Sequence, residues 1–307
     1  MAKIEAVRYR EETRDSRAAR ALVREGAARL KTAGLAHARA EAEWLLARLV
    51  GTKPLELYLR EGALPPRIAE RFRSQIDARA AGEPLQYLLG EADFFGQPFL
   101  VRPGVFIPRP ETEAVVERAL RALRARQERV GRPLRLLDLG TGSGCIAVTL
   151  ARALPACVLL GVELSWEALC VARQNVLRHG LASRVQVVQG RWTEPLRGTF
   201  DGVIANPPYV PSATVDHLPL DVRREPRASL DGGDDGMRDL AEVMAQAPRL
   251  LCPGGVLALE CGEGQVAPLA AAATAAGWAQ EVSPLRDLGQ RPRGVLMIKA
   301  EKERVLG

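Results

Sequence analysis

The sequence predicts an α/β fold in which a small bundle of helices precedes a Rossmann-like sheet. Apolar runs at residues 134–139, 158–162 and 200–205 have the length of buried parallel strands, and helical spacing lies between them. Residues 1–85, in contrast, contain only helical spacing and no strand-like alternation, which favours a bundle. The chain has 307 residues, so it is long enough for both domains.

Composition indicates an ordinary globular protein, with 47% hydrophobic and 26% charged residues. No apolar run is long enough to span a membrane, and the polar residues 1–12 do not resemble a signal peptide. The five cysteines contain no C-x-x-C pair, and the three histidines are scattered, which argues against a zinc site. We therefore expect a cytoplasmic protein without a metal centre.

Positive charge is concentrated at the N-terminal end of the chain. Residues 1–85 hold 17 Lys+Arg against 12 Asp+Glu, whereas the remainder holds 26 against 25. Such a surplus is typical of a domain that meets an acidic partner, either protein or nucleic acid. It is equally typical of a solvated, arginine-rich surface.

Helical spacing places four helices in the N-terminal part, at residues 18–33, 38–50, 54–60 and 66–80. Residues 92–95 and 98–101 then form two aromatic-rich runs around Gly96-Gln97, which predicts a hairpin. A helix is expected over residues 113–126, with Pro110 setting its start.

A glycine-rich turn follows the strand at residues 134–139. Gly140-Thr141-Gly142-Ser143-Gly144 connects that strand to a helix expected over residues 145–154. Glycines at such a turn let a nucleoside-bearing ligand approach the backbone closely. The next strand, at residues 158–162, ends in Glu163, where a carboxylate would accept hydrogen bonds from ribose hydroxyls.

A second motif, Asn206-Pro207-Pro208-Tyr209, follows the apolar strand at residues 200–205. The two prolines end the strand and leave Asn206 at the carboxyl edge of the sheet, where α/β folds place ligands. The Asn206 amide oxygen and a neighbouring backbone carbonyl are two acceptors for a neutral –NH2 group, and Tyr209 offers a flat face beside it. An ordinary strand-ending turn would have a similar composition.

Several stretches together resemble the HemK family, the peptide chain release factor glutamine methyltransferases. They are Glu83-Pro84-Leu85-Gln86-Tyr87, Ile107-Pro108-Arg109-Pro110-Glu111-Thr112-Glu113, Asp138-Leu139-Gly140-Thr141-Gly142-Ser143-Gly144 and Asn206-Pro207-Pro208-Tyr209, with Glu225-Pro226-Arg227-Ala228-Ser229-Leu230-Asp231-Gly232-Gly233 downstream. The Pro-Arg-Pro-Glu-Thr-Glu run distinguishes this family from its sister family, which acts on a ribosomal protein.

The resemblance implies a class I S-adenosylmethionine-dependent methyltransferase fold with a seven-stranded sheet. Its further strands would be residues 185–189 and 255–260 and an antiparallel last pair, 278–282 and 294–299. Helices would cover residues 165–179, 237–251 and 264–276. The implied domains are a helical substrate-docking domain at 1–85, a hairpin and linker at 86–112, and a catalytic domain at 113–307.

The resemblance also implies the site residues. S-adenosylmethionine would be held by Gly140, Thr141, Gly142, Ser143, Gly144, Glu163, Trp192 and Asn206. The substrate glutamine would be held by Asn206, Pro207, Pro208 and Tyr209, of which Asn206, Pro207 and Tyr209 would serve catalysis. Two positions depart from the family pattern. Glu163 stands where many relatives have Asp, and Arg191 stands where an Asp would contact adenine, so Trp192 is left either to pack on adenine or to be a core aromatic.

The activity that the resemblance implies is methyl transfer to the side-chain amide of the GGQ-motif glutamine in release factors, which modulates translation termination. The alternatives are a glutamine methyltransferase of a ribosomal protein and an amino-methyltransferase acting on adenine in nucleic acid. A catalytically silent RNA- or ribosome-binding protein of the same fold is a further alternative. We expect a monomer with no membrane partner and no need to bind nucleic acid directly.

Overall fold

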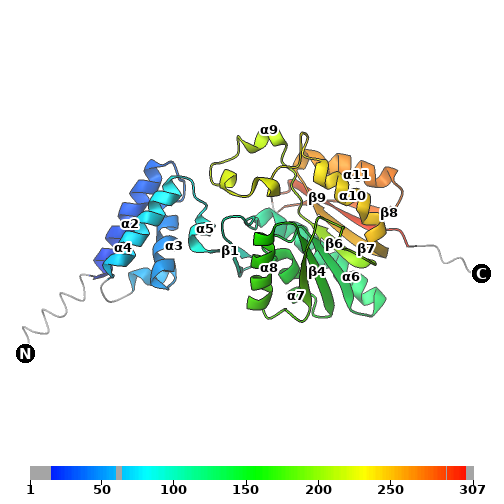
Figure 1. Cartoon of the computed structure of the whole chain (residues 1–307), viewed down its shortest axis with the longest axis horizontal. Coiled ribbons are helices and arrows are strands. Elements are labelled where there is room, and N and C mark those ends of the chain that lie inside the picture. Colours follow the sequence, from blue (N-terminus) through cyan, green and yellow to red (C-terminus); the bar gives the residue numbers. More distant parts are fainter. Residues whose placement is uncertain (1–14, 60–63, 288, 302–307) are drawn as a thin grey trace, which may run out of the picture. The chain divides into compact units, whose positions relative to one another are not determined.

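The computed structural model describes residues 15–59, 64–287 and 289–301 of the chain (Figure 1). These residues divide into two compact units. One comprises Met1–Gly90 with Leu220–Arg224, and the other Glu91–Pro219 with Glu225–Gly307.

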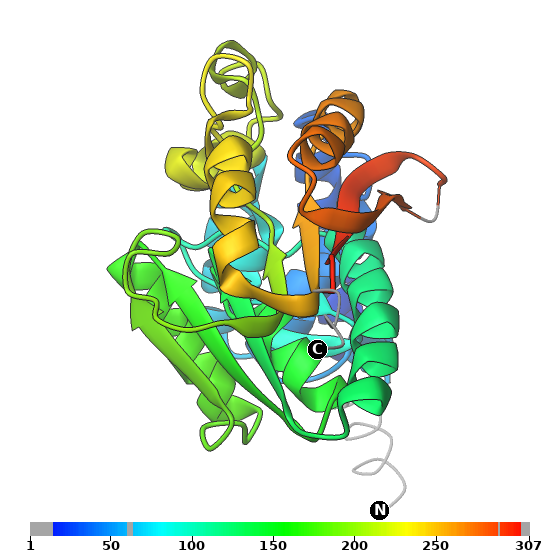
Figure 2. The ribbon, with the colours of Figure 1, turned by 90° about the vertical axis from the view of Figure 1, so that its right-hand side faces the viewer.

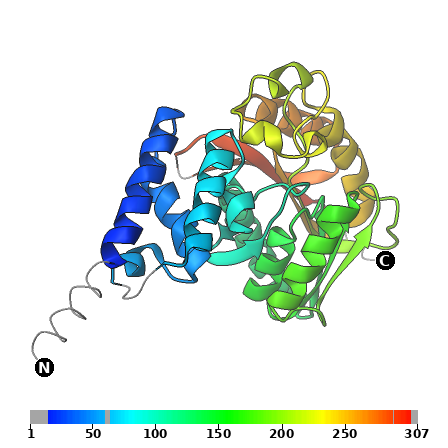
Figure 3. The same ribbon diagram turned by 60° about the vertical axis from the view of Figure 1, so that its left-hand side comes forward.

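The first unit is a helical bundle. Its helices are α2 (Asp15–Thr32), α3 (Ala38–Val50), α4 (Pro66–Ala80) and α5 (Leu85–Leu89), with a 3₁₀ turn, η1 (Pro54–Tyr58). The first three lie side by side in Figure 3 and enclose an apolar core. The bounds expected for the second and fourth helices are confirmed. The expected third helix is only a 3₁₀ turn, and its predicted last residue lies outside the described residues.

Close packing within the bundle depends on Gly26 of α2. A Cβ atom at this position would lie 2.7 Å from the Phe72 ring and 2.9 Å from Ile76 of α4. The absence of a side chain therefore lets α2 and α4 approach each other. Phe72 and Ile76 are both buried and fill the space between the helices.

The second unit contains a seven-stranded sheet in the order β5-β4-β3-β6-β7-β9-β8 (Figures 1 and 2). Neighbouring strands from β5 to β7 pair in parallel, while β9 pairs antiparallel with both β7 and β8. This confirms the predicted fold class and the antiparallel last pair. The strands are β3 (Leu134–Leu139), β4 (Cys157–Glu163), β5 (Val185–Gln189), β6 (Phe200–Ala205), β7 (Leu251–Glu260), β8 (Ala279–Arg286) and β9 (Pro292–Lys299).

Helices cover both faces of this sheet, because successive residues of a strand point to opposite faces. Leu136 belongs to an apolar cluster with α6 and α7, whereas Leu137 belongs to another with α10 and α11. In Figure 2, α6 and α10 accordingly lie on opposite sides of the strands. The helices are α6 (Pro110–Val130), α7 (Cys145–Ala153), α8 (Trp166–Arg178), α9 (Ser212–Val215), α10 (Arg238–Leu250) and α11 (Val266–Ala275), with 3₁₀ turns η2 (Val222–Arg224), η3 (Arg227–Ser229) and η4 (Glu263–Gln265).

Some element bounds differ from the expectations for identifiable reasons. Helix α6 runs on to Val130 instead of ending at residue 126, because Arg126 is buried and Gly131, at φ 62°, provides the cap. Strand β7 begins at Leu251, which pairs with Phe200 before a bulge shifts the register.

The expected hairpin also begins one residue earlier than predicted. Its strands are β1 (Glu91–Phe94) and β2 (Gln97–Leu100), which pair antiparallel. The turn consists of Phe95 and Gly96, at φ 52° and 65°, instead of Gly96 and Gln97. The left-handed pair is compatible with the twist of a two-residue hairpin.

Within the described residues, no helix is both long and apolar enough to cross a membrane. The same residues contain no cluster of three or more His, Cys, Asp or Glu side chains that could hold a metal ion.

Candidate active site

A cavity of about 580 Å³ opens at the carboxyl ends of β3, β4 and β6 in the second unit. Parallel α/β sheets place ligands at this edge, and the volume suits a ligand of nucleoside size. The residues of its wall that carry the argument are Thr112, the turn Gly140-Thr141-Gly142-Ser143, Glu163, Trp192, Asn206, Pro208 and Asp239.

The glycine-rich turn brings the backbone itself to the cavity wall. Gly140 and Gly142 have φ of 70° and 56°, in the left-handed region that favours glycine. A Cβ atom at Gly140 would lie 3.2 Å from the Trp192 ring. Ser143 is buried at the same wall, and its Oγ has no hydrogen-bond partner among the residues that the structure describes. Gly144, at φ 81°, is the N-cap of α7 and is not among the lining residues.

The turn is anchored by Asp138, which was not predicted as a site residue from the sequence. Its Oδ2 accepts a hydrogen bond from the Thr141 hydroxyl at 2.5 Å and one from the Ala147 N–H at 3.2 Å. Burial raises the pKa of Asp138 to about 7, although these two hydrogen bonds oppose the rise and the charge of Glu163 adds to it. The signal that could have identified it is a carboxylate inside an apolar strand, two residues before Gly140.

Glu163 lies at the end of β4 and lines the cavity, at the position predicted from the sequence. Its Oε2 accepts the Gly142 N–H at 2.8 Å, and its Oε1 accepts the Ser165 N–H at 2.8 Å. Burial raises the pKa of Glu163, and the N–H groups of Ser165 and Gly142 oppose that rise. Each carboxylate oxygen has a second lone pair, so hydroxyl groups of a ligand could still donate to it.

Asn206 also lines the cavity, directly after β6. Its Nδ2 donates to the hydroxyl of Thr112, at a distance of 3.2 Å from Oγ1. Thr112 is buried in the first turn of α6 and was not identified from the sequence. In the part of the chain that the structure describes, no hydrogen bond reaches the Asn206 amide oxygen, so it can accept from a ligand.

The rest of the Asn-Pro-Pro-Tyr motif divides between the cavity wall and the core. Pro208 lines the cavity, whereas Pro207 and Tyr209 are not among its lining residues. The Tyr209 ring packs against the apolar cluster around α10 and α11, and its hydroxyl donates to Glu260 Oε1 at 3.4 Å. Burial raises the pKa of Tyr209. Stacking of Tyr209 on a planar substrate therefore stays a prediction.

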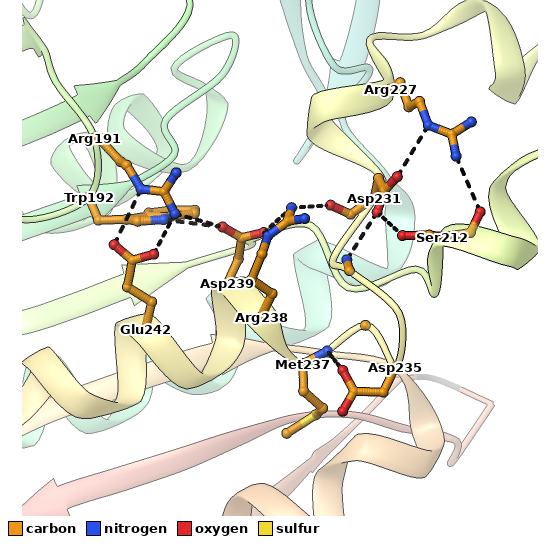
Figure 4. Close-up of polar contacts among 12 residues, drawn as sticks. Arg191, Trp192, Ser212, Arg227, Asp231, Asp235, Met237, Arg238, Asp239 and Glu242 are labelled. Carbon is orange, nitrogen blue, oxygen red and sulfur yellow. Dashed lines mark hydrogen bonds and ion pairs between the residues drawn. The ribbon is translucent and has the colours of Figure 1, made fainter.

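Trp192 and Arg191 meet two carboxylates of α10 (Figure 4). Trp192 Nε1 donates to Asp239 Oδ1 at 3.3 Å, and Trp192 and Asp239 both line the cavity. Arg191 pairs with Glu242 at 2.5 Å and lies 3.7 Å from Asp239. Asp239 also forms an ion pair with Arg238 at 2.8 Å.

The backbone at Trp192 has φ 43°, which is uncommon for a bulky residue and holds its ring at the wall. Asp239 thus places a carboxylate at the cavity wall beside Trp192. Asp239 was not predicted from the sequence because its contact with Trp192 spans 47 residues of chain.

Glu225 joins two of the stretches that carry the family resemblance. Its Oε2 accepts the Ile107 N–H at 2.9 Å, and its Oε1 pairs with the Arg109 guanidinium. The carboxylate is buried, so these donors compensate for its lost hydration. Pro108 and Ser229 on either side of this contact line the cavity.

Comparisons with known proteins agree with this arrangement. The PrmC N-terminal domain matches residues 21–90, and the methyltransferase small domain matches residues 100–218. A release factor glutamine methyltransferase from Moorella thermoacetica is 42% identical over 280 residues, which cover 91% of this chain and 97% of that protein. One from Geobacter sulfurreducens is 43% identical over 235 residues, covering 76% and 80%.

Among solved structures, the hMettl16 catalytic domain in complex with a MAT2A 3′UTR hairpin superimposes with a TM-score of 0.51. It is 16% identical, and the match covers 78% of this chain and 84% of that one. At this identity the likeness concerns the fold alone.

Proposed function

This chain belongs to the release factor glutamine methyltransferase family, and we propose that it methylates the side-chain amide nitrogen of a glutamine in a peptide chain release factor. The observation that carries the proposal is the Asn206 side chain at the cavity wall. Its Nδ2 is engaged by Thr112, which leaves its amide oxygen to accept a hydrogen bond from a substrate –NH2 group.

The methyl donor in this proposal is S-adenosylmethionine, which supplies a methyl group on a positively charged sulfur when bound. The cavity residues fit such a ligand. Glu163 presents carboxylate oxygens for ribose hydroxyls, the turn from Gly140 to Ser143 presents backbone, and the unpartnered Ser143 Oγ adds a polar contact. Trp192 offers a flat apolar wall for the base.

The chain's own part in the reaction is to position the nucleophile. An amide nitrogen is a weak nucleophile because its lone pair is delocalised into the carbonyl. Asn206 Oδ1 and the Pro207 carbonyl would each accept one N–H, which holds the nitrogen and turns its lone pair toward the methyl group. Positioning and preorganised dipoles would supply most of the rate, and no base is needed before the N–C bond forms. The bond between the methyl group and sulfur would break as the N–C bond forms, and the nitrogen would then lose one proton to water.

A direct test is to incubate the purified protein with S-adenosylmethionine and a release factor, and to map the added methyl group by peptide mass spectrometry. The proposal predicts one methyl group on the glutamine of the GGQ motif. Parallel reactions should contain a ribosomal protein substrate and an adenine-containing oligonucleotide. A methyl group found on either of these instead would support one of the alternative activities.

For the N-terminal unit we propose a docking role. Residues 1–85 carry most of the net charge and would bind the release factor. Residues 86–112 would connect this domain to residues 113–307, which would catalyse methyl transfer. A glutamine in an exposed loop offers little surface, so a second contact raises its effective concentration at Asn206.

The measurement for the docking role is the specificity constant for intact release factor and for a short glutamine-containing peptide, with and without residues 1–80. Docking predicts that the deletion impairs methylation of the protein far more than that of the peptide. Added salt should reproduce part of this loss, because charge-steered association weakens with ionic strength. Equal losses on both substrates would mean that the bundle only stabilises the catalytic unit.

A further inference from the structure

Part of the cavity wall is built by two irregular segments of the second unit, residues 102–109 and 225–232. Neither segment belongs to a strand of the sheet or to an α-helix. The hydrogen bonds between strands therefore do not hold this part of the wall, and other contacts must. The lining residues of the two segments are Gly104, Phe106, Pro108, Pro226, Ala228 and Ser229.

Both segments are attached to the Asn-Pro-Pro-Tyr motif at their carboxyl ends. The first runs into α6, where the Thr112 hydroxyl accepts the Asn206 amide N–H at 3.2 Å. The second pairs with Val210, the residue directly after the motif. The Val210 N–H donates to the Leu230 carbonyl at 2.9 Å, and the Gly232 N–H donates to the Val210 carbonyl at 2.9 Å. The two segments thus border the part of the cavity that contains Asn206.

Glu225 connects the two segments to each other. Its Oε2 accepts the Ile107 N–H at 2.9 Å, and its Oε1 pairs with the Arg109 guanidinium. The Glu225 side chain is only 1% exposed, so water and salt screen these contacts little. Arg109 in turn lies over the Phe106 ring, with its guanidinium carbon 5.0 Å from the ring centroid. One buried carboxylate therefore holds both the backbone of the first segment and, through Arg109, a side chain that lines the cavity.

We propose that Glu225 is a positioning residue for the substrate: by holding the two segments together, it sets the width of the cavity beside Asn206, where the substrate glutamine would enter. The inference rests on the proposed function, in which that glutamine is methylated. The residues proposed to hold S-adenosylmethionine include the glycine-rich turn and Glu163, which follow or end strands of the sheet. Glu225 should therefore affect binding of the release factor and leave the cofactor almost untouched.

The decisive variant is Glu225→Gln, which keeps the size of the side chain but replaces one acceptor oxygen with an –NH2 group. That group would face either the Ile107 N–H or the Arg109 guanidinium, so donor would meet donor and one contact would be lost. We expect KM for release factor to rise by about 10-fold or more, as for the loss of a hydrogen bond to a charged group. In contrast, kcat should change less than about 3-fold, and the dissociation constant of S-adenosylmethionine less than about 2-fold.

A second variant tests the same contact from its half-exposed side. Arg109→Met removes the guanidinium from Glu225 and from the Phe106 ring, and should also raise KM. The double variant should raise KM no further than the larger single change, because both substitutions break one contact. Glu128→Gln, which removes the same charge at an exposed position of α6, is the matched control and should leave KM unchanged.

The short glutamine-containing peptide separates this role from docking by the N-terminal unit. The wall would meet the glutamine itself, so Glu225→Gln should impair methylation of the peptide as much as that of intact release factor. Deletion of residues 1–80, in contrast, is expected to spare the peptide. A loss in Glu225→Gln that is confined to intact release factor would overturn the inference.

A binding measurement without methyl transfer distinguishes the inference from the proposed function. The probe is release factor, titrated by calorimetry into protein saturated with S-adenosylhomocysteine, which has no methyl group to transfer. Its dissociation constant should rise by about 10-fold in Glu225→Gln and stay unchanged in Glu128→Gln. Unchanged release factor affinity, or an equal loss of S-adenosylmethionine affinity, would overturn the inference. A wild type that binds release factor in this way but leaves its glutamine unmethylated would overturn the proposed function alone.

Discussion

A buried carboxylate near the amino end of β6 and two buried carboxylates near the carboxyl ends of β3 and β7 differ in their partners. Near the amino end of β6, the Asp201 carboxylate forms ion pairs with Arg126 and Arg132, each at 2.8 Å. It also accepts a hydrogen bond from the Arg135 N–H at 3.0 Å. Burial alone would raise the pKa of Asp201, but the hydrogen bonds from Arg132, Arg135 and Arg126 outweigh it and lower the pKa. This carboxylate is ionised and fully partnered.

At the carboxyl end, Asp138 and Glu260 are equally buried but form no ion pair within the described part of the chain. Burial raises the pKa of each to about 7. Four buried side-chain atoms lack a hydrogen-bond partner among the described residues, and three of them, on Asp138, Ser143 and Glu260, lie at this end. A folded chain leaves polar groups unsatisfied only at a cost of a few kcal/mol, so this end is arranged for a ligand and not for stability.

The largest expected effect comes from breaking the partnered end. Arg126→Met leaves Asp201 with a buried charge that is only partly compensated, which should lower the free energy of unfolding by about 3 to 5 kcal/mol. Chemical denaturation at neutral pH measures this. Arg124→Met, at an exposed position of the same helix, is the control and should change stability by less than about 0.5 kcal/mol. Equal effects would remove the contrast between the two ends.

Asn206→Ala should show the opposite behaviour, with little loss of stability and a large loss of rate. Removing one preorganised polar contact to the reacting group typically costs about 100- to 1000-fold in kcat. Affinity for S-adenosylmethionine should stay nearly intact, because Asn206 is expected to hold the nucleophile. Near wild-type turnover at saturating release factor would contradict the role given to Asn206.

The contrast between the two ends was only partly visible in the sequence. The strands β3 and β6 were predicted to the residue, because glycine and proline mark where their apolar runs stop. The residues placed at the cavity from the sequence also lie at strand ends: Glu163 is the last residue of β4, and Asn206 directly follows β6. Local order along the chain is sufficient to place such residues.

Residues that reach the site from elsewhere were not predictable in this way. Thr112 meets Asn206, and Asp239 meets Trp192, only because separate elements pack together. The same holds for the continuation of α6 past residue 126, which depends on the pairing of Arg126 with Asp201 across 75 residues of chain. Hydrophobic periodicity contains no information on such pairings.

The effect of pH on the free energy of unfolding should have opposite signs for the carboxylates at the two ends, Glu260 and Asp201. Glu260 binds its proton more tightly in the folded state, so its contribution to stability is present below about pH 4.5 and is lost as the pH rises through about 7. Glu260→Gln should therefore be more stable than the wild type above pH 7, by up to about 3 kcal/mol, since one pKa unit corresponds to about 1.4 kcal/mol.

Asp201→Asn should behave in the reverse sense. Because the pKa of Asp201 is lowered from its ordinary value of 3.8, Asp201 stabilises the fold at pH values above 3.8. This contribution is lost as the pH falls below 3.8 through the lowered pKa. Denaturant titrations of both variants and the wild type from about pH 2 to pH 8 measure the difference. Parallel curves for Glu260→Gln and the wild type would refute the assignment of a raised pKa.

The cofactor contacts should give a smaller effect. Glu163→Ala removes the carboxylate proposed to accept ribose hydroxyls, and hydrogen bonds to charged groups contribute roughly 1.5 to 3 kcal/mol. We expect S-adenosylmethionine to bind about 10- to 100-fold more weakly by calorimetry. Gly142→Val should weaken binding as well, because a β-branched residue is strained at φ 56°. Unchanged S-adenosylmethionine binding in both variants would show that the ligand does not bind at this turn.

The smallest effect is expected at Arg191, which pairs with Glu242 of α10. Its side chain is 42% exposed, and its partner Glu242 is 35% exposed, so water already screens the pair. Such pairs contribute at most about 1 kcal/mol, and Arg191→Gln should change stability and S-adenosylmethionine affinity by no more than that.

Asp239→Asn is the informative comparison, because this buried carboxylate holds Trp192 at the wall and also receives Arg238. Its loss should weaken S-adenosylmethionine binding more than the loss of Arg191 does. Calorimetry on the two variants decides between the residues. A larger loss of affinity in Arg191→Gln would mean that Arg191 itself contacts the ligand. Its guanidinium would then serve ligand binding in addition to pairing with the carboxylates of α10.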